Sequence, residues 1–121
     1  MQNKSIVWRQ QSFSELSNYD LYKIIQLRLE VFSLEQRCNY QDLDNIDLAS
    51  YHLLGFDKEV LVAYTRLVPP KTKYTEMSIG RVLTKATHRK LGLGKDLMNL
   101  SIKNIWELYG KGNIKIGAQL Y

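Results

Sequence analysis

Apolar residues follow two different spacings along this chain, and the changes of spacing mark its elements. Runs rich in β-branched and aromatic residues predict five strands, over residues 5–10, 51–56, 60–68, 76–84 and 114–118. Apolar residues recurring every three or four positions predict two helices, one from a capping box at residues 17–20 to about residue 34 and one over residues 92–109. The order β-α-β-β-β-α-β predicts one α+β domain spanning residues 1–121.

Turn-forming residues separate the predicted elements. Residues 57–59 predict a hairpin turn between two strands, and Pro69 and Pro70 end the second of them because proline donates no ladder hydrogen bond. Gly110 and Gly112 end the second helix. Residues 35–49 are rich in aspartate and asparagine, which favours turns and a short helical piece.

Composition and charge limit the classes of protein to consider. A chain of 121 residues fits one domain, and its net charge of +5 favours an anionic partner: nucleic acid, a phosphorylated cofactor or an acidic substrate. The single cysteine, Cys38, excludes an internal disulfide, and no cysteine spacing typical of a metal site occurs. With no apolar leader or membrane-spanning run, we expect a soluble cytoplasmic protein.

The segment most informative about function is a basic turn between a predicted strand and a predicted helix, Arg89-Lys90-Leu91-Gly92-Leu93-Gly94-Lys95. The first N–H groups of a helix have no intrahelical partner, and the helix dipole adds positive charge there. Glycines allow a phosphate to approach the backbone. The sequence therefore predicts an anion cradle suited to a pyrophosphate, whereas a bare helix start with solubilising charges is the simpler interpretation.

Two familiar phosphate-binding motifs do not fit this turn. A Walker A loop requires Ser or Thr after Gly-Lys, but Asp96 follows Gly94-Lys95. A Rossmann fingerprint requires a third glycine where this chain has Leu97.

The order Arg89-x-x-Gly92-x-Gly94 after a strand resembles the acyl-CoA site of the GNAT acetyltransferases. The segment at the first helix resembles the ElaA-type branch of that superfamily. The matching positions are Arg28, Val31, Phe32, Glu35, Gln36, Cys38 and Tyr40. The run Ile116-Gly117-Ala118-Gln119 also resembles this branch. The resemblance implies a mixed sheet with flanking helices, in which the fourth and fifth strands are parallel and splay apart.

The same resemblance implies a mechanism with acetyl-CoA as cosubstrate and no metal. Backbone groups of Val82, Leu83 and Thr84 would pair with pantetheine, and one N–H would polarise the thioester carbonyl. The turn from Arg89 to Gly94 would hold the pyrophosphate, with Lys95 adding charge. A primary amine, on a small molecule or a peptide, would attack the thioester directly through a tetrahedral intermediate.

The sequence does not identify the general base or the general acid. Glu35 and Glu76 are weak candidates for the base, since the plausible strand positions hold Ser78 and Gly80. Three aspartates, Asp42, Asp44 and Asp47, predict either a solvated acidic turn or a rim that attracts a cationic substrate. The usual acid in the superfamily is a tyrosine on a later helix. This chain ends at Tyr121, before that helix and the last strands, so we expect an excised domain, a shortened gene product or a protein that a partner completes.

Other classes of function compete with the acetyltransferase. One is a non-catalytic CoA-binding or interaction domain, and an incomplete sheet would favour a homodimer. A basic nucleic-acid-binding module is weaker, because the Lys and Arg residues are scattered and form no platform with aromatic residues.

Overall fold

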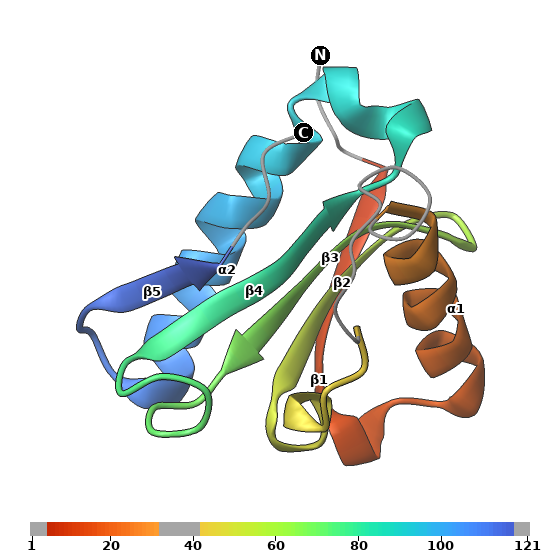
Figure 1. Ribbon diagram of the computed structural model, residues 1–121. Coiled ribbons are helices and arrows are strands. Elements are labelled where there is room, and N and C mark those ends of the chain that lie inside the picture. The colour runs from red at the N-terminus through yellow and green to blue at the C-terminus, as the bar shows by residue number, and fades with distance from the viewer. Residues whose placement is uncertain (1–4, 32–41, 118–121) are drawn as a thin grey trace.

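A computed structural model describes residues 5–31 and 42–117 of the chain (Figure 1). One five-stranded sheet has the order β1-β2-β3-β4-β5. Its strands are β1 (Ile6–Ser12), β2 (Tyr51–Asp57), β3 (Val60–Val68), β4 (Met77–Thr84) and β5 (Ile114–Gly117). Neighbours are antiparallel from β1 to β4, while β4 and β5 are parallel. The predicted mixed sheet and element order are thus confirmed.

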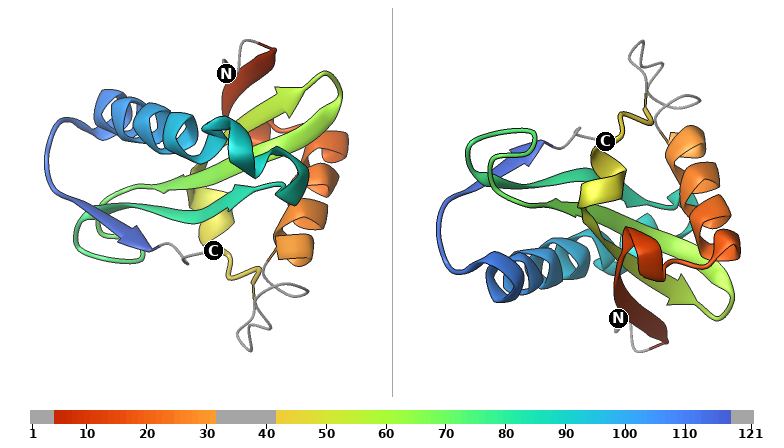
Figure 2. Two further views of the ribbon diagram at one scale, coloured as in Figure 1. Left: turned by 90° about the horizontal axis from the view of Figure 1, so that it is seen from above. Right: turned by 90° about the horizontal axis from the view of Figure 1, so that it is seen from below.

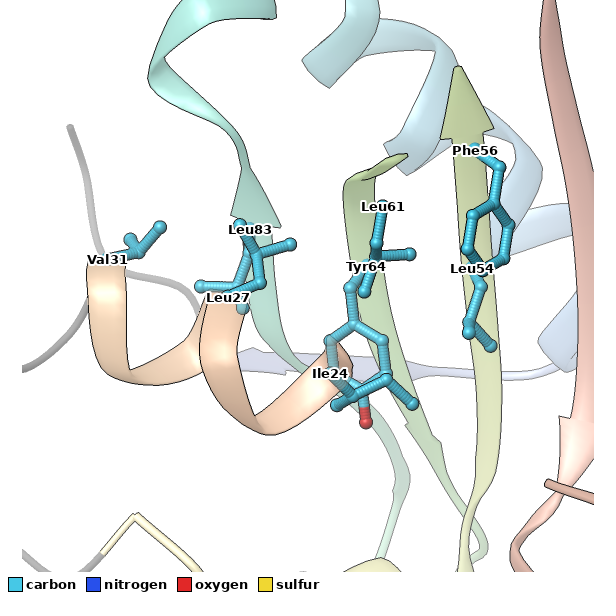
Figure 3. Close-up of a cluster of buried hydrophobic side chains, with 8 residues drawn as sticks. All are labelled: Ile24, Leu27, Val31, Leu54, Phe56, Leu61, Tyr64 and Leu83. Atoms are coloured by element: carbon cyan, nitrogen blue, oxygen red, sulfur yellow. The ribbon is translucent and has the colours of Figure 1, made fainter. Parts of the chain in front are cut away.

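Two helices cover opposite faces of this sheet (Figure 2). On one face, Ile24 and Leu27 of α1 (Asn18–Arg28) pack against Leu54, Tyr64 and other buried side chains of the sheet (Figure 3). On the other face, α2 (Leu93–Tyr109) packs Leu97 against the strands. Adjacent strand residues serve opposite helices, because successive side chains of a strand point to opposite faces.

The first helix differs from its prediction at both ends. The Ser17 side chain accepts a hydrogen bond from the Asp20 N–H at 3.0 Å, but the Asp20 carboxylate pairs with Arg9 instead of closing a capping box. The α-helix ends at Arg28, and a π-helical turn follows over residues 29–31. The predicted continuation over residues 32–34 lies outside the described residues.

Short 3₁₀ helices fill most of the remaining connections. The predicted short helical piece is η3 (Ile46–Ala49), and the basic stretch before α2 is η4 (Ala86–Leu91). A further one, η1 (Phe13–Glu15), was not predicted; the Glu15 carboxylate accepts from the Ser12 N–H at 2.8 Å. None of the helices in the described part of the chain is long and apolar enough to cross a bilayer.

Strand β4 carries a bulge where it separates from β5. Tyr64 of β3 pairs with Leu83 and Arg66 pairs with Gly80, so two residues of β4 lie opposite one residue of β3. One of the two, Arg81, has a positive φ of 51°. The β4–β5 pairing ends at Gly80 opposite Gly117 within the described residues. Among the described residues, the part of β4 from Arg81 onward pairs with β3 but has no partner in β5.

Candidate acyl-CoA site

The turn between β4 and α2 opens a helix whose first N–H groups have no acceptor within the helix. Gly92 is the N-cap of α2 and adopts the left-handed conformation, with φ 74° and ψ 13°. Because glycine has no side chain, it supplies no side-chain cap hydrogen bond. The first α-helical bond of this end runs from the Asp96 N–H to the Gly92 carbonyl at 3.1 Å. The N–H groups of Leu93, Gly94 and Lys95 precede that bond, so they are the donors that a helix leaves for a ligand.

Open space surrounds this turn. No heavy atom lies within 4 Å of the place that a Gly92 side chain would take. At Gly94 the nearest neighbour of such a side chain is the Thr84 methyl group, 4.0 Å away, at the end of β4. Gly92, Gly94 and Lys95 are exposed, and this helix start adjoins the end of β4. These residues fit the diphosphate of an acyl-CoA.

The charged residues of the turn have distinct surroundings. The Arg89 Nε donates to the Thr84 carbonyl at 3.0 Å, so its guanidinium lies against the end of β4. Lys95 is exposed in the first turn of α2. His88 pairs with Asp57 at 2.9 Å and Lys85 with Glu30 at 3.1 Å. The side chains of Lys90 and Leu91 lie outside the described part of the structure.

At the end of β4, backbone groups and not side chains are the candidates for binding a ligand. Val82 packs on the α2 side of the sheet, whereas Leu83 is buried on the α1 side. Thr84 contacts the start of α2. With these side chains directed to the two faces, the peptide groups of Val82, Leu83 and Thr84 lie along the edge, as the prediction of backbone pairing with pantetheine requires.

The three predicted aspartates are bound by three buried arginines. Arg28 donates to Asp42 at 2.8 Å and to Asp47 at 2.7 Å. The shortest contact of Arg66 is to Asp44 at 2.7 Å, and Arg81 lies 2.9 Å from Asp42 and 3.3 Å from Asp44. The sequence analysis left open a solvated turn and a substrate rim; the structure shows an internal ion-pair network at these positions, with its charges already balanced.

This network makes Asp44 and Asp47 weak bases. Burial alone would raise the pKa of Asp47, but hydrogen bonds and positive charge from Arg28 and Arg66 outweigh it and lower that pKa. The pKa of Asp44 is likewise lowered, because its partners Arg66 and Arg81 outweigh the effect of burial. The other two candidates, Glu76 and Glu35, do not identify the base either. Glu76 is exposed just before β4, and Glu35 lies outside the described residues.

A buried histidine extends the same network. His52 Nε2 lies 3.0 Å from the Asp47 carbonyl, which can only accept, so Nε2 carries the proton. Its Nδ1 then accepts from the Tyr64 hydroxyl at 2.5 Å. Burial lowers the pKa of His52, with Arg28 and Arg66 nearby adding to the effect. The sequence analysis singled out neither Arg66 nor Arg81. The signal available was a charged residue inside a run of strand residues, since arginine is rarely buried without a partner.

Comparison with known proteins shows the family of this chain. The family model of the acetyltransferase (GNAT) family matches residues 18–115, so the chain belongs to that family. Among its relatives, ElaA of Escherichia coli is 35% identical over 118 residues, which cover 96% of this chain and 77% of ElaA. A UPF0039 protein of Synechocystis is 38% identical over 117 residues, covering 96% and 76%.

Solved structures of relatives match most of this chain. The crystal structure of E. coli ElaA matches with a TM-score of 0.87 at 35% identity and covers 94% of this chain and 78% of ElaA. The crystal structure of an acyl-CoA N-acyltransferase from Pseudomonas aeruginosa matches with a TM-score of 0.86 at 33% identity, covering 92% and 77%. The acyl-CoA N-acyltransferase fold and the resemblance to the ElaA-type branch are thereby confirmed.

Proposed function

We propose that this protein is an N-acetyltransferase that moves an acetyl group from acetyl-CoA to a primary amine. The start of α2 binds the pyrophosphate through the N–H groups of Leu93, Gly94 and Lys95, and the Arg89 and Lys95 side chains add positive charge. The observation that carries the proposal is the exposed helix start at Gly92, which has no side-chain cap and lies beside Thr84 at the end of β4.

The edge of β4 positions the reacting group. Peptide groups of Val82, Leu83 and Thr84 hydrogen-bond the pantetheine arm, and an N–H next to the Arg81 bulge stabilises the negative charge that develops on the thioester oxygen. Acetyl-CoA supplies the thioester. The neutral amine donates its lone pair to the carbonyl carbon, the C–S bond breaks, and the amine nitrogen loses a proton as the thiolate gains one. Because the amine attacks directly, no nucleophile of the protein is required, and positioning supplies much of the rate.

Paired substitutions at Gly92 test the pyrophosphate site. Gly92→Glu and Gly92→Gln introduce side chains of the same size at the same left-handed position, so both carry the same backbone strain. Only Glu adds negative charge beside the phosphates, and we expect it to abolish CoA binding measured by isothermal titration. The Gln variant should bind at least tenfold more tightly than the Glu variant. Equal and undiminished affinity in both variants would remove the pyrophosphate from this turn.

A CoA-binding domain without turnover is the second candidate. It is favoured by one observation: Asp42, Asp44 and Asp47 are all engaged by arginines, which leaves no strong base among them. A thiol-release assay with a panel of primary amines separates the two candidates. We expect amine-dependent release of CoA thiol; heat of CoA binding without any thiol release would favour the binding domain.

A further inference from the structure

A small hollow lies where the pairing of β4 and β5 ends, on the sheet face that carries α1. Its lining includes Arg66, Lys73, Tyr74, Ser78 and Gly117, and its volume is about 10 Å³. It adjoins a wider, solvent-open hollow of about 500 Å³, formed by residues 71–76 and Lys115, since Lys73 and Tyr74 line both. We call the two together the Lys73 hollow. It is separate from the helix start that holds the pyrophosphate in the proposed function.

The floor of the Lys73 hollow contains a buried cation with an unused donor. Arg66 is fully buried, with 0% of its surface exposed. Its Nη1 donates to Asp44 at 2.7 Å and to Asp47 at 3.1 Å, and its Nη2 donates to Asp44 at 3.2 Å. Among residues 5–31 and 42–117, its Nε has no hydrogen-bond partner. Leaving a buried donor unpaired is costly, and such a group calls for a ligand or an ordered water.

The wall of the hollow adds further positive charge around one aromatic ring. The Lys115 Nζ lies 4.6 Å from the centre of the Tyr74 ring, and the Lys73 Nζ lies 5.8 Å from it. Lys71 also lines the wider part, whose lining contains one carboxylate, that of Glu76. Lysines thus outnumber carboxylates in the lining of this surface.

The charged groups near Lys73 on the neighbouring strands also favour binding of an anion. Partial desolvation lowers the pKa of Lys73, and Arg66 and Arg81 lower it further, more strongly than Asp44 and Asp47 raise it. The two arginines therefore influence this ammonium group more than the two aspartates do. A positive potential in a partly desolvated hollow favours an anion.

We infer that the Lys73 hollow binds an anionic group, carboxylate or phosphate, of the acceptor amine, with Lys73 and the Arg66 Nε as its donors. The inference rests on the proposed function and narrows its substrate class to small amines that carry negative charge. The hollow borders Gly80 and Gly117, the last pair before the strands separate. An acceptor anchored there by its anionic group would hold its amine next to the bulge at Arg81, where the thioester oxygen is stabilised.

Nuclear magnetic resonance titrations test this site without requiring turnover. The probes are 4-aminobutyrate, O-phosphoethanolamine and 4-aminobutyramide, in which a neutral amide group replaces the carboxylate, each added with and without acetyl-CoA. We expect at least one of the two anionic probes to shift the Arg66 Nε–H resonance and to raise the pKa of Lys73, since a bound anion stabilises the ammonium form. The neutral amide should do neither. Comparing the carboxylate and phosphate probes distinguishes which anion the site prefers.

Two variants connect these shifts to Lys73. Lys73→Met should weaken binding of the preferred anionic probe at least tenfold, because a charged donor is lost. Lys103→Met, at an exposed lysine of α2, is the matched control and should leave that affinity unchanged. Because Lys73 is exposed on a loop, its variant is expected to keep the amide spectrum of the core.

Two results would overturn the inference: absence of an Arg66 Nε–H shift with both anions, or equal shifts with the neutral amide. The outcome is separable from that for the proposed function. If 4-aminobutyrate bound at Lys73 but acetyl-CoA did not bind at the start of α2, the acetyltransferase proposal would fail while the anion site stood. Binding of acetyl-CoA without any anion effect would leave the acetyltransferase and remove only the anion site.

Discussion

At the scale of single residues, three buried arginines set the character of the protein's interior. Arg28, Arg66 and Arg81 are at most 7% exposed, and each lies against aspartates of residues 42–47. Removing a charged group from water costs roughly several kcal/mol, and only well-aligned ion pairs and hydrogen bonds offset this cost. The network therefore contributes less to net stability than to fixing where residues 42–50 lie against the sheet. Removing one partner would be strongly destabilising.

His52 makes the stability of this network depend on pH. Its folded pKa is lowered below the usual value of 6.5 by burial and nearby arginines. The unfolded chain therefore takes up a proton first, so this contribution is complete above pH 6.5 and is lost as pH falls through the folded pKa. We expect the free energy of unfolding to fall between pH 7 and 5, by at most about 1.4 kcal/mol per pH unit for one proton.

Urea unfolding at a series of pH values measures this slope. His52→Gln can keep a donor toward Asp47 and an acceptor toward Tyr64 but does not titrate, so we expect a flatter profile in that window. His88→Gln, at the chain's other histidine, is the matched control. A slope that His52→Gln leaves unchanged would contradict the assignment. Loss of stability from the lowered pKa of Asp47 belongs to a separate window, because it begins only near its ordinary pKa of 3.8 and continues below it.

At the scale of elements, the bulge in β4 is the feature that the acyl-CoA site depends on. Arg81 adopts a φ of 51°, which costs a non-glycine residue roughly 1–2 kcal/mol. Its guanidinium is held by Asp42 and Asp44, and these contacts keep the strained backbone in place. Residues far from the turn thus help to orient the strand edge at Val82.

The order of stability of two Arg81 variants tests this strain. Arg81→Gly and Arg81→Ala both lose the ion pairs, but only glycine accepts a positive φ without penalty. We expect the glycine variant to be more stable by roughly 0.5 to 1 kcal/mol in urea unfolding, against the usual preference for alanine in a strand. Ser78→Gly and Ser78→Ala, in the regular part of β4, should show the usual order. An alanine variant more stable than the glycine variant at Arg81 would mean that the bulge relaxes.

Much of this element structure was accessible from the sequence. Strand β3 and helix α2 lie almost where predicted, because Val60–Val68 is rich in β-branched and other apolar residues and Leu93–Tyr109 has apolar residues at helical spacing. The ion-pair network was not predictable, since nothing along the chain says that residues 28, 66 and 81 meet in space. The bulge was missed for a related reason: it reflects the partners of the Arg81 side chain and not its backbone propensity.

At the scale of the whole molecule, the two proposed sites lie at different places along β4. The start of α2 adjoins the end of β4, while the Lys73 hollow borders Gly80 and Gly117, where the pairing of β4 with β5 ends. The sequence predicted the first through its glycines. It did not predict the second, because residues 71–76 appear only as a polar loop until the sheet brings Arg66 and Lys115 to it.

The most direct test of the central claim is an amide chemical-shift titration of the intact chain with CoA. We predict the largest changes at the N–H groups of Leu93, Gly94 and Lys95, followed by those of Val82 to Thr84. A rival location exists in the open hollow of about 550 Å³ between α1 and the start of β3, which includes Lys23 and Lys85. Shifts confined to that hollow, with the start of α2 unchanged, would contradict the account.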